Sequence, residues 1–311
     1  MAINLKKMAS QGDLLAPGHR ACAGCAGASI LRMIANTAGP NTVVGLATGC
    51  MEVVTTIYPY TAWRIPYIHN AFENVAATIS GVETAYRALK KKGKIDKKIN
   101  FIAIGGDGGT YDIGLQALSG AMERGHNMLY ICYDNEAYMN TGIQRSGATP
   151  YGAATSTTPA GKKIPGKRQH RKPLTEIMVA HDIPYVAQAS PHNFMDFMRK
   201  VQRALEIEGP AFINVIMPCP VGWRFPENQS IEMARKAVDS CFWPLFEVEY
   251  GEWKLNYNPE KAGKKIPIEE WIKPQGRFRH LFAPENRHII DELQAWVDKN
   301  WARLKKLAGV E

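Results

Sequence analysis

One segment of the sequence constrains the fold more than any other, because it has the pattern of a complete strand–helix–strand unit. Apolar residues 100–105 run into a glycine-rich turn, a helical pattern covers about 111–124 and is stopped by Gly125, and a second apolar run covers 127–133. This order is typical of two neighbouring parallel strands joined by a crossover helix. Further strand and helix patterns alternate on both sides of it, so the sequence predicts an α/β fold with a doubly wound, mostly parallel sheet.

The chain divides by pattern into a body and a tail. Residues 1–222 carry the strand and helix patterns, whereas residues 223–311 have scattered aromatics and prolines. This favours an extension that wraps the core or partner subunits over an independent domain. Within the body, residues 141–172 have almost no periodicity. A loop of that length in a compact domain is usually functional, so we expect a lid or a docking segment there.

The composition excludes some classes of function. The apolar stretches are strand-sized and too short to span a membrane, and the N-terminal residues lack the apolar run of an export signal, so we expect a cytoplasmic protein with no membrane association. Part of the net charge of +9 lies in two basic runs, 90–98 and 161–172. Each is best explained as a solvated loop, with a docking surface for an acidic partner as the alternative. Neither run is interleaved with aromatics, so nucleic acid is not an expected partner.

Asp107 lies where the first strand of this unit ends, flanked by glycines at positions 105, 106, 108 and 109. Ligands of parallel sheets bind beyond the carboxyl ends of the strands, and glycines let backbone N–H groups approach phosphate oxygens. The carboxylate would repel a diphosphate unless a cation lay between them, and Mg²⁺ accepts such oxygen ligands. Asn135 follows the end of the neighbouring strand and is the expected second ligand. The pair predicts a magnesium–diphosphate site.

Two cysteines, Cys22 and Cys25, stand in the segment "CAGC" at the expected start of a helix. Such a pair can be a redox dithiol, half of a zinc site, half of an iron–sulfur site, or two thiols with no special role. Six cysteines in a chain without an export signal favour metal ligands or redox groups over structural disulfides. The spacing alone does not choose among these.

The motifs together carry a resemblance to a known family. "GDG" followed, after the crossover helix, by "DN" resembles the thiamine diphosphate motif of transketolase-like and 2-oxoacid-processing enzymes. "NTGIQRSGATP" is similar to the segment after the metal ligands in β subunits of pyruvate- and 2-oxoacid:ferredoxin oxidoreductases. The resemblance implies a diphosphate-domain fold for residues 1–222, and Mg²⁺ held by Asp107, Asn135 and the carbonyl of Ala137. The cofactor-binding residues that it implies are Gly27, Gly49, Cys50, Gly106, Asp107, Gly108, Gly109, Asn135, Ala137, Asn140 and Thr141.

In that family four cysteines bind one [4Fe–4S] cluster close to the thiamine ring. The resemblance assigns this role to Cys22, Cys25, Cys50 and Cys219, and it gives catalytic roles to Asn140 and Cys50. Cys132 and Cys241 are left over, and Cys132 is expected to be a buried, inert thiol because it lies within an apolar strand. A structural zinc site made from the same four thiolates is the alternative to the cluster.

The resemblance implies a catalytic subunit for the oxidative decarboxylation of a 2-oxoacid, with pyruvate as the expected substrate. The products would be acyl-CoA and CO₂, electrons would pass through the cluster to ferredoxin, and the reaction would be reversible. The expected partners are a pyrimidine-domain α subunit that supplies an activating glutamate, a γ subunit with the coenzyme A region, and a ferredoxin-like δ subunit. The alternatives are a relative acting on branched-chain 2-oxoacids or oxalate, a non-oxidative thiamine-dependent lyase or synthase with a zinc site, and a non-catalytic assembly subunit.

Overall fold

Eight strands form one twisted layer at the centre of the molecule, in the order β2-β1-β3-β4-β6-β5-β7-β8. The computed structural model describes residues 3–10 and 12–310. Strands β1 to β6 pair in parallel, and β7 and β8 join the sheet antiparallel, which confirms the mostly parallel sheet. The strands are β1 (Thr42–Ala47), β2 (Tyr67–Asn70), β3 (Asn100–Gly106), β4 (Leu129–Asp134), β5 (Tyr185–Ala189), β6 (Ala211–Ile216), β7 (Phe246–Glu249) and β8 (Glu252–Leu255).

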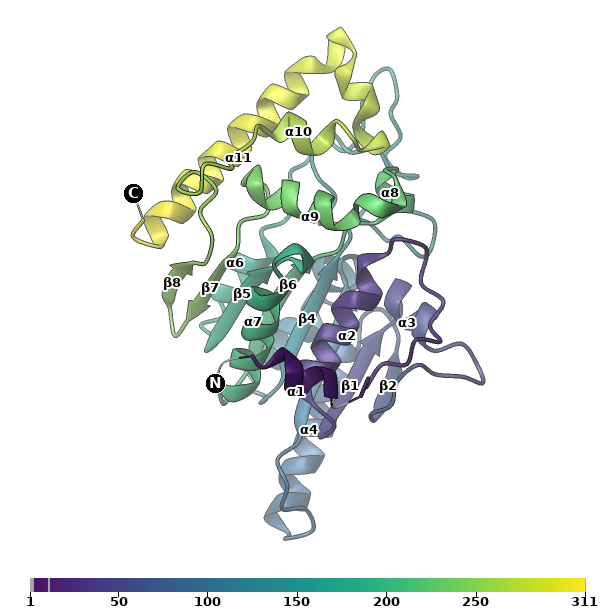
Figure 1. The fold of residues 1–311 in the computed structure, drawn as a ribbon, viewed down its shortest axis with the longest axis vertical. Helices are drawn as coiled ribbons and strands as arrows, with labels where there is room; N and C mark the ends of the chain where they lie inside the picture. The colour runs from purple at the N-terminus through teal and green to yellow at the C-terminus, as the bar shows by residue number, and fades with distance from the viewer. Residues whose placement is uncertain (1–2, 11, 311) are drawn as a thin grey trace.

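Helices cover both faces of the sheet, as in a doubly wound fold (Figure 1). α2 and α7 pack against each other on one face, and α4, α5 and α6 pack on the other. The described helices α1 to α11 include none that is long and apolar enough to cross a membrane. They are α1 (Leu5–Ser10), α2 (Ala26–Ala38), α3 (Cys50–Thr55), α4 (Val75–Lys91), α5 (Leu115–Glu123), α6 (Leu174–Val179), α7 (Phe194–Glu206), α8 (Pro220–Trp223), α9 (Ser230–Asp239), α10 (Ile268–Ile272) and α11 (Arg287–Leu307).

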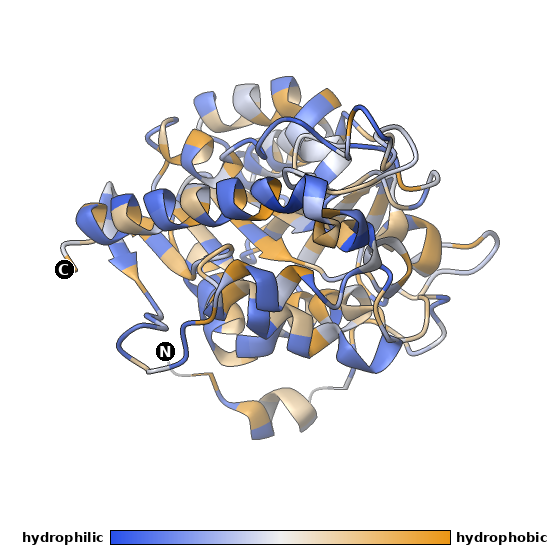
Figure 2. Cartoon of the chain, turned by 90° about the horizontal axis from the view of Figure 1, so that it is seen from above, coloured by the Kyte–Doolittle hydropathy of each residue, from blue (hydrophilic) through white to orange (hydrophobic). Residues whose placement is uncertain are grey.

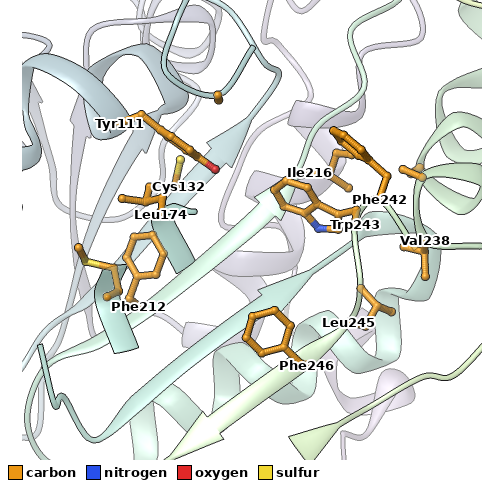
Figure 3. Close-up of a cluster of buried hydrophobic side chains, with 14 of the residues drawn as sticks. Tyr111, Cys132, Leu174, Phe212, Ile216, Val238, Phe242, Trp243, Leu245 and Phe246 are labelled. Atoms are coloured by element: carbon orange, nitrogen blue, oxygen red, sulfur yellow. The ribbon is translucent and has the colours of Figure 1, made fainter. Parts of the chain in front are cut away.

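A cluster of buried apolar side chains lies on each face of the sheet. Seen from above, the central strands are largely apolar, and the outer helices carry hydrophilic residues on their outward sides (Figure 2). The cluster under α4–α6 continues into the tail, where Phe242, Trp243 and Phe246 lie near Phe212 and Leu174 of the body (Figure 3). Residues beyond 222 therefore share the core of the body, while a domain boundary at 222 stays a prediction.

The strand–helix–strand unit is present, with one difference at its turn. The expected strands are β3 and β4, and the expected helix over about 111–124 is α5, which ends before Gly125. Between β3 and α5 the chain makes a π-helical turn over Gly108–Ile113, in which the Gly114 N–H donates to the Gly109 carbonyl at 2.6 Å. Wide turns of this kind are frequent at functional sites. The turn places the backbone after Asp107 at the carboxyl edge of the sheet.

Glu247 of β7 holds the antiparallel strands to the parallel sheet through its buried carboxylate. The hydroxyl of Tyr185 in β5 donates to it at 2.7 Å, the amide of Asn256 donates at 2.9 Å, and Arg199 of α7 pairs with it at 3.2 Å. Burial alone would raise the pKa of Glu247, but these hydrogen bonds and the charge of Arg199 lower it to about 2. The carboxylate is therefore more stable in the folded chain than in the unfolded chain.

Glu247→Gln is expected to lower the free energy of unfolding by about 2 kcal/mol at pH 7, with a smaller loss at pH 3. A depressed folded pKa contributes stability above the unfolded value, and that contribution is lost as the pH falls from about 4.5 towards 2. Urea unfolding at both pH values measures it. Glu252→Gln, at an exposed position of β8, is the matched control. Equal losses of unfolding free energy at the two pH values would contradict the lowered pKa of Glu247.

Candidate active site

A pocket lies where β1, β3 and β4 end, at the carboxyl edge of the parallel sheet. Its wall comes from the turn after β1, the π-helical turn after β3 and the loop after β4. Every cofactor-binding residue expected from the sequence lines it, except Gly27. Its lining residues are Thr48, Gly49, Cys50, Phe72, Gly106, Asp107, Gly108, Gly109, Tyr133, Asn135, Ala137, Tyr138, Met139, Asn140 and Thr141.

Gly27 lies instead beside the cysteine pair. Its backbone N–H donates to Sγ of Cys25 at 3.4 Å, and a Cβ at this position would lie 2.3 Å from Sδ of Met51. A side chain here would displace the ends of Met51 and Met217, and Gly27 contacts a proposed sulfur ligand rather than the pocket.

Asp107 is a buried carboxylate in the pocket wall with neutral hydrogen-bond donors only. The Asn135 backbone N–H donates to its Oδ1 at 3.2 Å, and the Ser146 hydroxyl donates to its Oδ2 at 2.5 Å. Within residues 3–10 and 12–310, no Lys, Arg or His forms an ion pair with it. Burial, and then the charge of Asp134, raise the pKa of Asp107 well above its ordinary value. A cation beside this group would reverse that shift.

The side-chain oxygen of Asn135 faces two other oxygens, Oδ1 of Asp107 at 2.9 Å and the carbonyl oxygen of Ala137 at 2.8 Å. Three acceptors this close repel one another. Two arrangements remove the repulsion: a rotated amide whose nitrogen donates to both oxygens, or a cation bound by all three. Adjacent ligands of an octahedral Mg²⁺, with Mg–O distances of about 2.0–2.1 Å, lie about 2.9 Å apart. The Asn135 oxygen is therefore spaced from the other two oxygens as an adjacent Mg²⁺ ligand would be.

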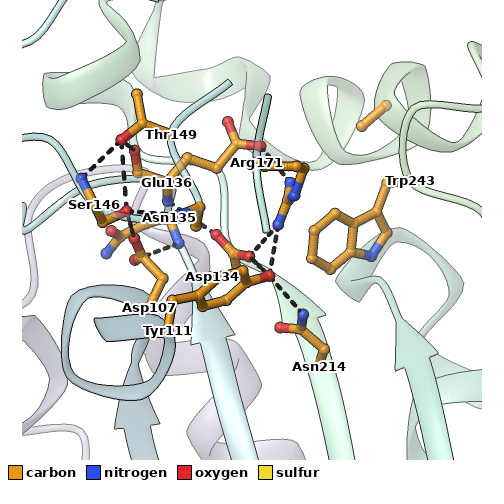
Figure 4. A network of polar contacts seen from close by, with 12 residues as sticks. Asp107, Tyr111, Asp134, Asn135, Glu136, Ser146, Thr149, Arg171, Asn214 and Trp243 are labelled. Atoms are coloured by element: carbon orange, nitrogen blue, oxygen red, sulfur yellow. Dashed lines mark hydrogen bonds and ion pairs between the residues drawn. The ribbon is translucent and has the colours of Figure 1, made fainter. Parts of the chain in front are cut away.

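Two buried ion pairs of one arginine hold the loop that carries Asn135 and Ala137. Arg171 pairs with both Asp134 and Glu136, the residues on either side of Asn135, and lies over the ring of Trp243 (Figure 4). Tyr111 donates its hydroxyl proton to Asp134 at 2.6 Å. Both carboxylates are fully buried, yet each has a cationic partner, whereas Asp107 has none among residues 3–10 and 12–310.

Two glycines of the π-helical turn have no room for a side chain. A Cβ on Gly108 would lie 2.4 Å from the ring of Tyr138, and one on Gly109 would lie 2.7 Å from the carbonyl oxygen of Phe72. Both neighbours line the pocket. The glycines therefore let the backbone of the turn approach the opposite wall.

Three of the four expected cluster cysteines lie at helix N-termini. Cys25 and Cys219 are the N-cap residues of α2 and α8, and Cys50 is the first residue of α3. The Gly222 N–H donates to Sγ of Cys219 at 3.3 Å, as the Gly27 N–H does to Cys25. Helix N-termini and N–H donors favour a thiolate, the form that binds metals.

The four thiols are near enough to influence one another. Burial, together with the charges of Cys219 and Cys22, raises the pKa of Cys25 to about 11. Burial also raises the pKa of Cys50, followed by the charges of Cys219, Cys25 and Asp107. In the described part of the chain, no three His, Cys, Asp or Glu side chains form a group that could hold a metal ion as they stand. Cys132 and Cys241 are both buried away from this group.

The sequence did not point to several residues of the site. Phe72, Tyr133 and Tyr138 line the pocket, and Ser146 bonds Asp107. The aromatic residues lie in segments that also read as ordinary core or loop. Ser146 belongs to the segment "NTGIQRSGATP" that supported the family resemblance. Its contact with Asp107 is therefore the one contact among these that the sequence could have suggested.

Comparisons with known proteins agree with this geometry. The family described as "Thiamine pyrophosphate enzyme, C-terminal TPP binding domain" matches residues 47–215, which include the pocket. The fold and site thus define a thiamine diphosphate-binding α/β protein. A solved 2-oxoglutarate:ferredoxin oxidoreductase from Magnetococcus marinus has a similar fold, with a TM-score of 0.56 and 20% identity over 70% of this chain and 77% of that one.

Closer relatives define the family. Pyruvate synthase subunit PorB of Thermotoga maritima is 54% identical over 100% of this chain and 98% of its own length, and that of Methanocaldococcus jannaschii is 56% identical over 92% and 95%. Ketoisovalerate oxidoreductase subunit VorB of Pyrococcus abyssi is 48% identical over 94% and 93%. The chain belongs to the family of PorB subunits of 2-oxoacid:ferredoxin oxidoreductases. It is a subunit of a multi-subunit enzyme.

Gly108→Ala is expected to weaken thiamine diphosphate binding by about tenfold, because the added methyl group displaces the Tyr138 ring into the pocket. Calorimetric titration of the complex with thiamine diphosphate measures the effect. Gly81→Ala is the matched control, since a Cβ there has nothing within 4 Å and lies on the exposed side of α4. If the Gly108 variant keeps the parental affinity and is folded by circular dichroism, the predicted displacement of the Tyr138 ring into the pocket is wrong.

Proposed function

We propose that this chain is the cofactor-binding catalytic subunit of a cytoplasmic pyruvate:ferredoxin oxidoreductase. The reaction is the reversible oxidative decarboxylation of pyruvate to acetyl-CoA and CO₂, with electrons passed through a [4Fe–4S] cluster to ferredoxin. The observation that carries the proposal is the buried Asp107, which has no cationic partner among the described residues and lies in a pocket of a thiamine diphosphate-binding fold.

Mg²⁺ is the cation that we assign to this position. Asp107, the Asn135 amide oxygen and the Ala137 carbonyl oxygen are the proposed ligands, supported by their mutual spacing. Gly106, Gly108 and Gly109 would let the backbone at the start of the helical turn approach the diphosphate. When bound, thiamine diphosphate supplies the electron sink for decarboxylation of a 2-oxoacid. Asn140 and Thr141, on the outer part of the pocket wall, are the proposed neighbours of the reacting end.

Cys22, Cys25, Cys50 and Cys219 are the proposed cluster ligands. Their support is threefold: three lie at helix N-termini, two accept backbone N–H groups, and the four affect one another electrostatically. A [4Fe–4S] cluster takes four thiolates, and a structural zinc site made from the same four cysteines is the alternative. Cys50 also lines the pocket, so the cluster would lie beside the cofactor.

The choice of pyruvate rests on the relatives. Relatives named pyruvate synthase subunits are 49% to 56% identical, compared with 48% for two named ketoisovalerate oxidoreductase subunits. The second candidate is therefore an oxidoreductase for branched-chain 2-oxoacids. The proposed partners are a pyrimidine-domain α subunit, a γ subunit with the coenzyme A region, a ferredoxin-like δ subunit, and ferredoxin and coenzyme A in turnover.

The assembled complex is expected to oxidise pyruvate with a kcat/KM at least about tenfold above that for 2-oxoisovalerate, because a site selective for pyruvate would have to exclude the larger isopropyl group. Coenzyme A-dependent reduction of ferredoxin, followed optically without oxygen, measures both. A preference for 2-oxoisovalerate would replace pyruvate by the second candidate, and turnover without an electron acceptor would contradict the oxidative reaction.

Cys219→Ala is expected to remove most of the iron and sulfide of this subunit, because one of four thiolates is lost, while thiamine diphosphate remains bound. Iron, acid-labile sulfide and zinc are measured in the subunit after anaerobic purification from the complex. Cys132→Ala is the control, since Cys132 lies buried within β4, and it should keep parental iron. Full iron in the Cys219 variant, or zinc without sulfide in the parent, would exclude the cluster.

A further inference from the structure

Glu136 stands between the two residues that face Asp107, and its conformation is unusual. Its φ of 68° lies in the left-handed region, which a residue with a long side chain seldom occupies. Its N–H donates to Asp134 at 3.1 Å, and its carbonyl accepts the hydroxyl of Thr149 at 2.7 Å. Such a conformation persists only where the surroundings fix it. Here it determines how Asn135 and Ala137 are presented to the pocket.

The side chain of Glu136 does not line the pocket and is fixed by two guanidinium groups. Oε1 accepts from Arg171 at 3.0 Å, and Oε2 accepts from Arg277 at 2.5 Å. Arg171 comes from the loop before α6. Arg277 comes from the tail, 141 residues further along the chain than Glu136. Since all three side chains are almost completely buried, the carboxylate depends on both arginines for its charge balance.

Arg277 is itself held in one orientation. Its Nε donates to Oε1 of Gln275 at 2.9 Å, and its guanidinium lies over the Trp223 ring, 4.1 Å from the centroid. The same Trp223 donates its indole N–H to the carbonyl oxygen of Asn135 at 2.8 Å. Residues of the tail therefore bind the loop after β4 at two neighbouring points, the Glu136 carboxylate and the Asn135 carbonyl.

We propose that Arg277 is a positioning residue for the magnesium–diphosphate site: acting through the buried Glu136 carboxylate, it fixes the loop so that the Asn135 amide and the Ala137 carbonyl face Asp107. This rests on the proposed function, because it takes these oxygens as Mg²⁺ ligands. Arg277 does not line the pocket, so it acts on the cofactor only through the loop. Arg171 pairs with both Glu136 and Asp134, whereas Arg277 pairs with Glu136 and forms no ion pair with another described carboxylate.

The test measures the Mg²⁺ concentration that gives half-maximal thiamine diphosphate binding by the assembled complex, after removal of cofactor and metal. Arg277→Met should raise this concentration by about tenfold or more, as expected when a group that orients a metal ligand is lost. Arg277→Lys keeps the charge without the fork that reaches Gln275 and Glu136 together, so it should fall between Met and the parent. Arg303→Met is the matched control, because Arg303 is a tail arginine paired with Glu176 at the surface, and it should shift the value less than about twofold.

A double-mutant cycle distinguishes positioning from general loss of structure. If Arg277 acts through Glu136, then Arg277→Met should shift the Mg²⁺ requirement much less in a Glu136→Gln background, where the charge is already gone. The same shift in both backgrounds, or a parental requirement in Arg277→Met, would overturn the proposal. A parent that binds thiamine diphosphate equally well without a divalent cation would overturn the metal assignment and this proposal together. If the parent needs Mg²⁺ and the Arg277→Met variant needs the same Mg²⁺ concentration, only the positioning role is overturned.

Discussion

The arrangement of the site depends on an imbalance of buried charge at the ends of β3 and β4. Asp107, Asp134 and Glu136 are all buried there, and two guanidinium groups face them. Both arginines are engaged by Asp134 and Glu136, which leaves Asp107 with two neutral donors. Burying an uncompensated carboxylate is strongly unfavourable, so the group either keeps its proton or takes a cation. The pocket is thus formed around a carboxylate that has no ion-pair partner among the described residues.

The surrounding backbone keeps that carboxylate next to open space. Parallel pairing of β1, β3 and β4 brings three strand ends to one edge, and the glycines of the π-helical turn let its backbone approach Tyr138 and Phe72 on the opposite wall. Part of the basic run 161–172 is also used here. Lys167 is buried, with its ammonium group donating to the backbone carbonyl of Thr149 at 2.5 Å, and burial lowers its pKa to about 7. Expecting a wholly solvated run was wrong for Lys167 and Arg171, since both are buried beside the site.

The local part of this site could be predicted from the sequence, and the long-range part could not. A glycine-flanked aspartate at a strand end, followed by an asparagine at the next strand end, carries its own signal, because topology alone brings the two together. The π-helical turn has no such signal, since glycines favour many turns. The contact of Trp223 with Asn135 joins positions 88 residues apart, and that of Arg277 with Glu136 joins positions 141 residues apart. In the sequence, a single arginine in an aromatic tail has no feature that tells whether it is solvated or paired with a buried carboxylate.

That long-range contact also bears on what residues 223–311 are for. A tail that only covered apolar surface would affect the pocket through overall stability. This tail instead supplies a counter-charge to Glu136 and, through α8 and the segment after α10, the aromatic surface against which that charge lies. Breaking a buried ion pair by removing one partner costs about 3–5 kcal/mol. Glu136 in the strained loop therefore has both of its guanidinium partners only when the tail is folded onto the sheet, so sheet, loop and tail form one structural unit around the site.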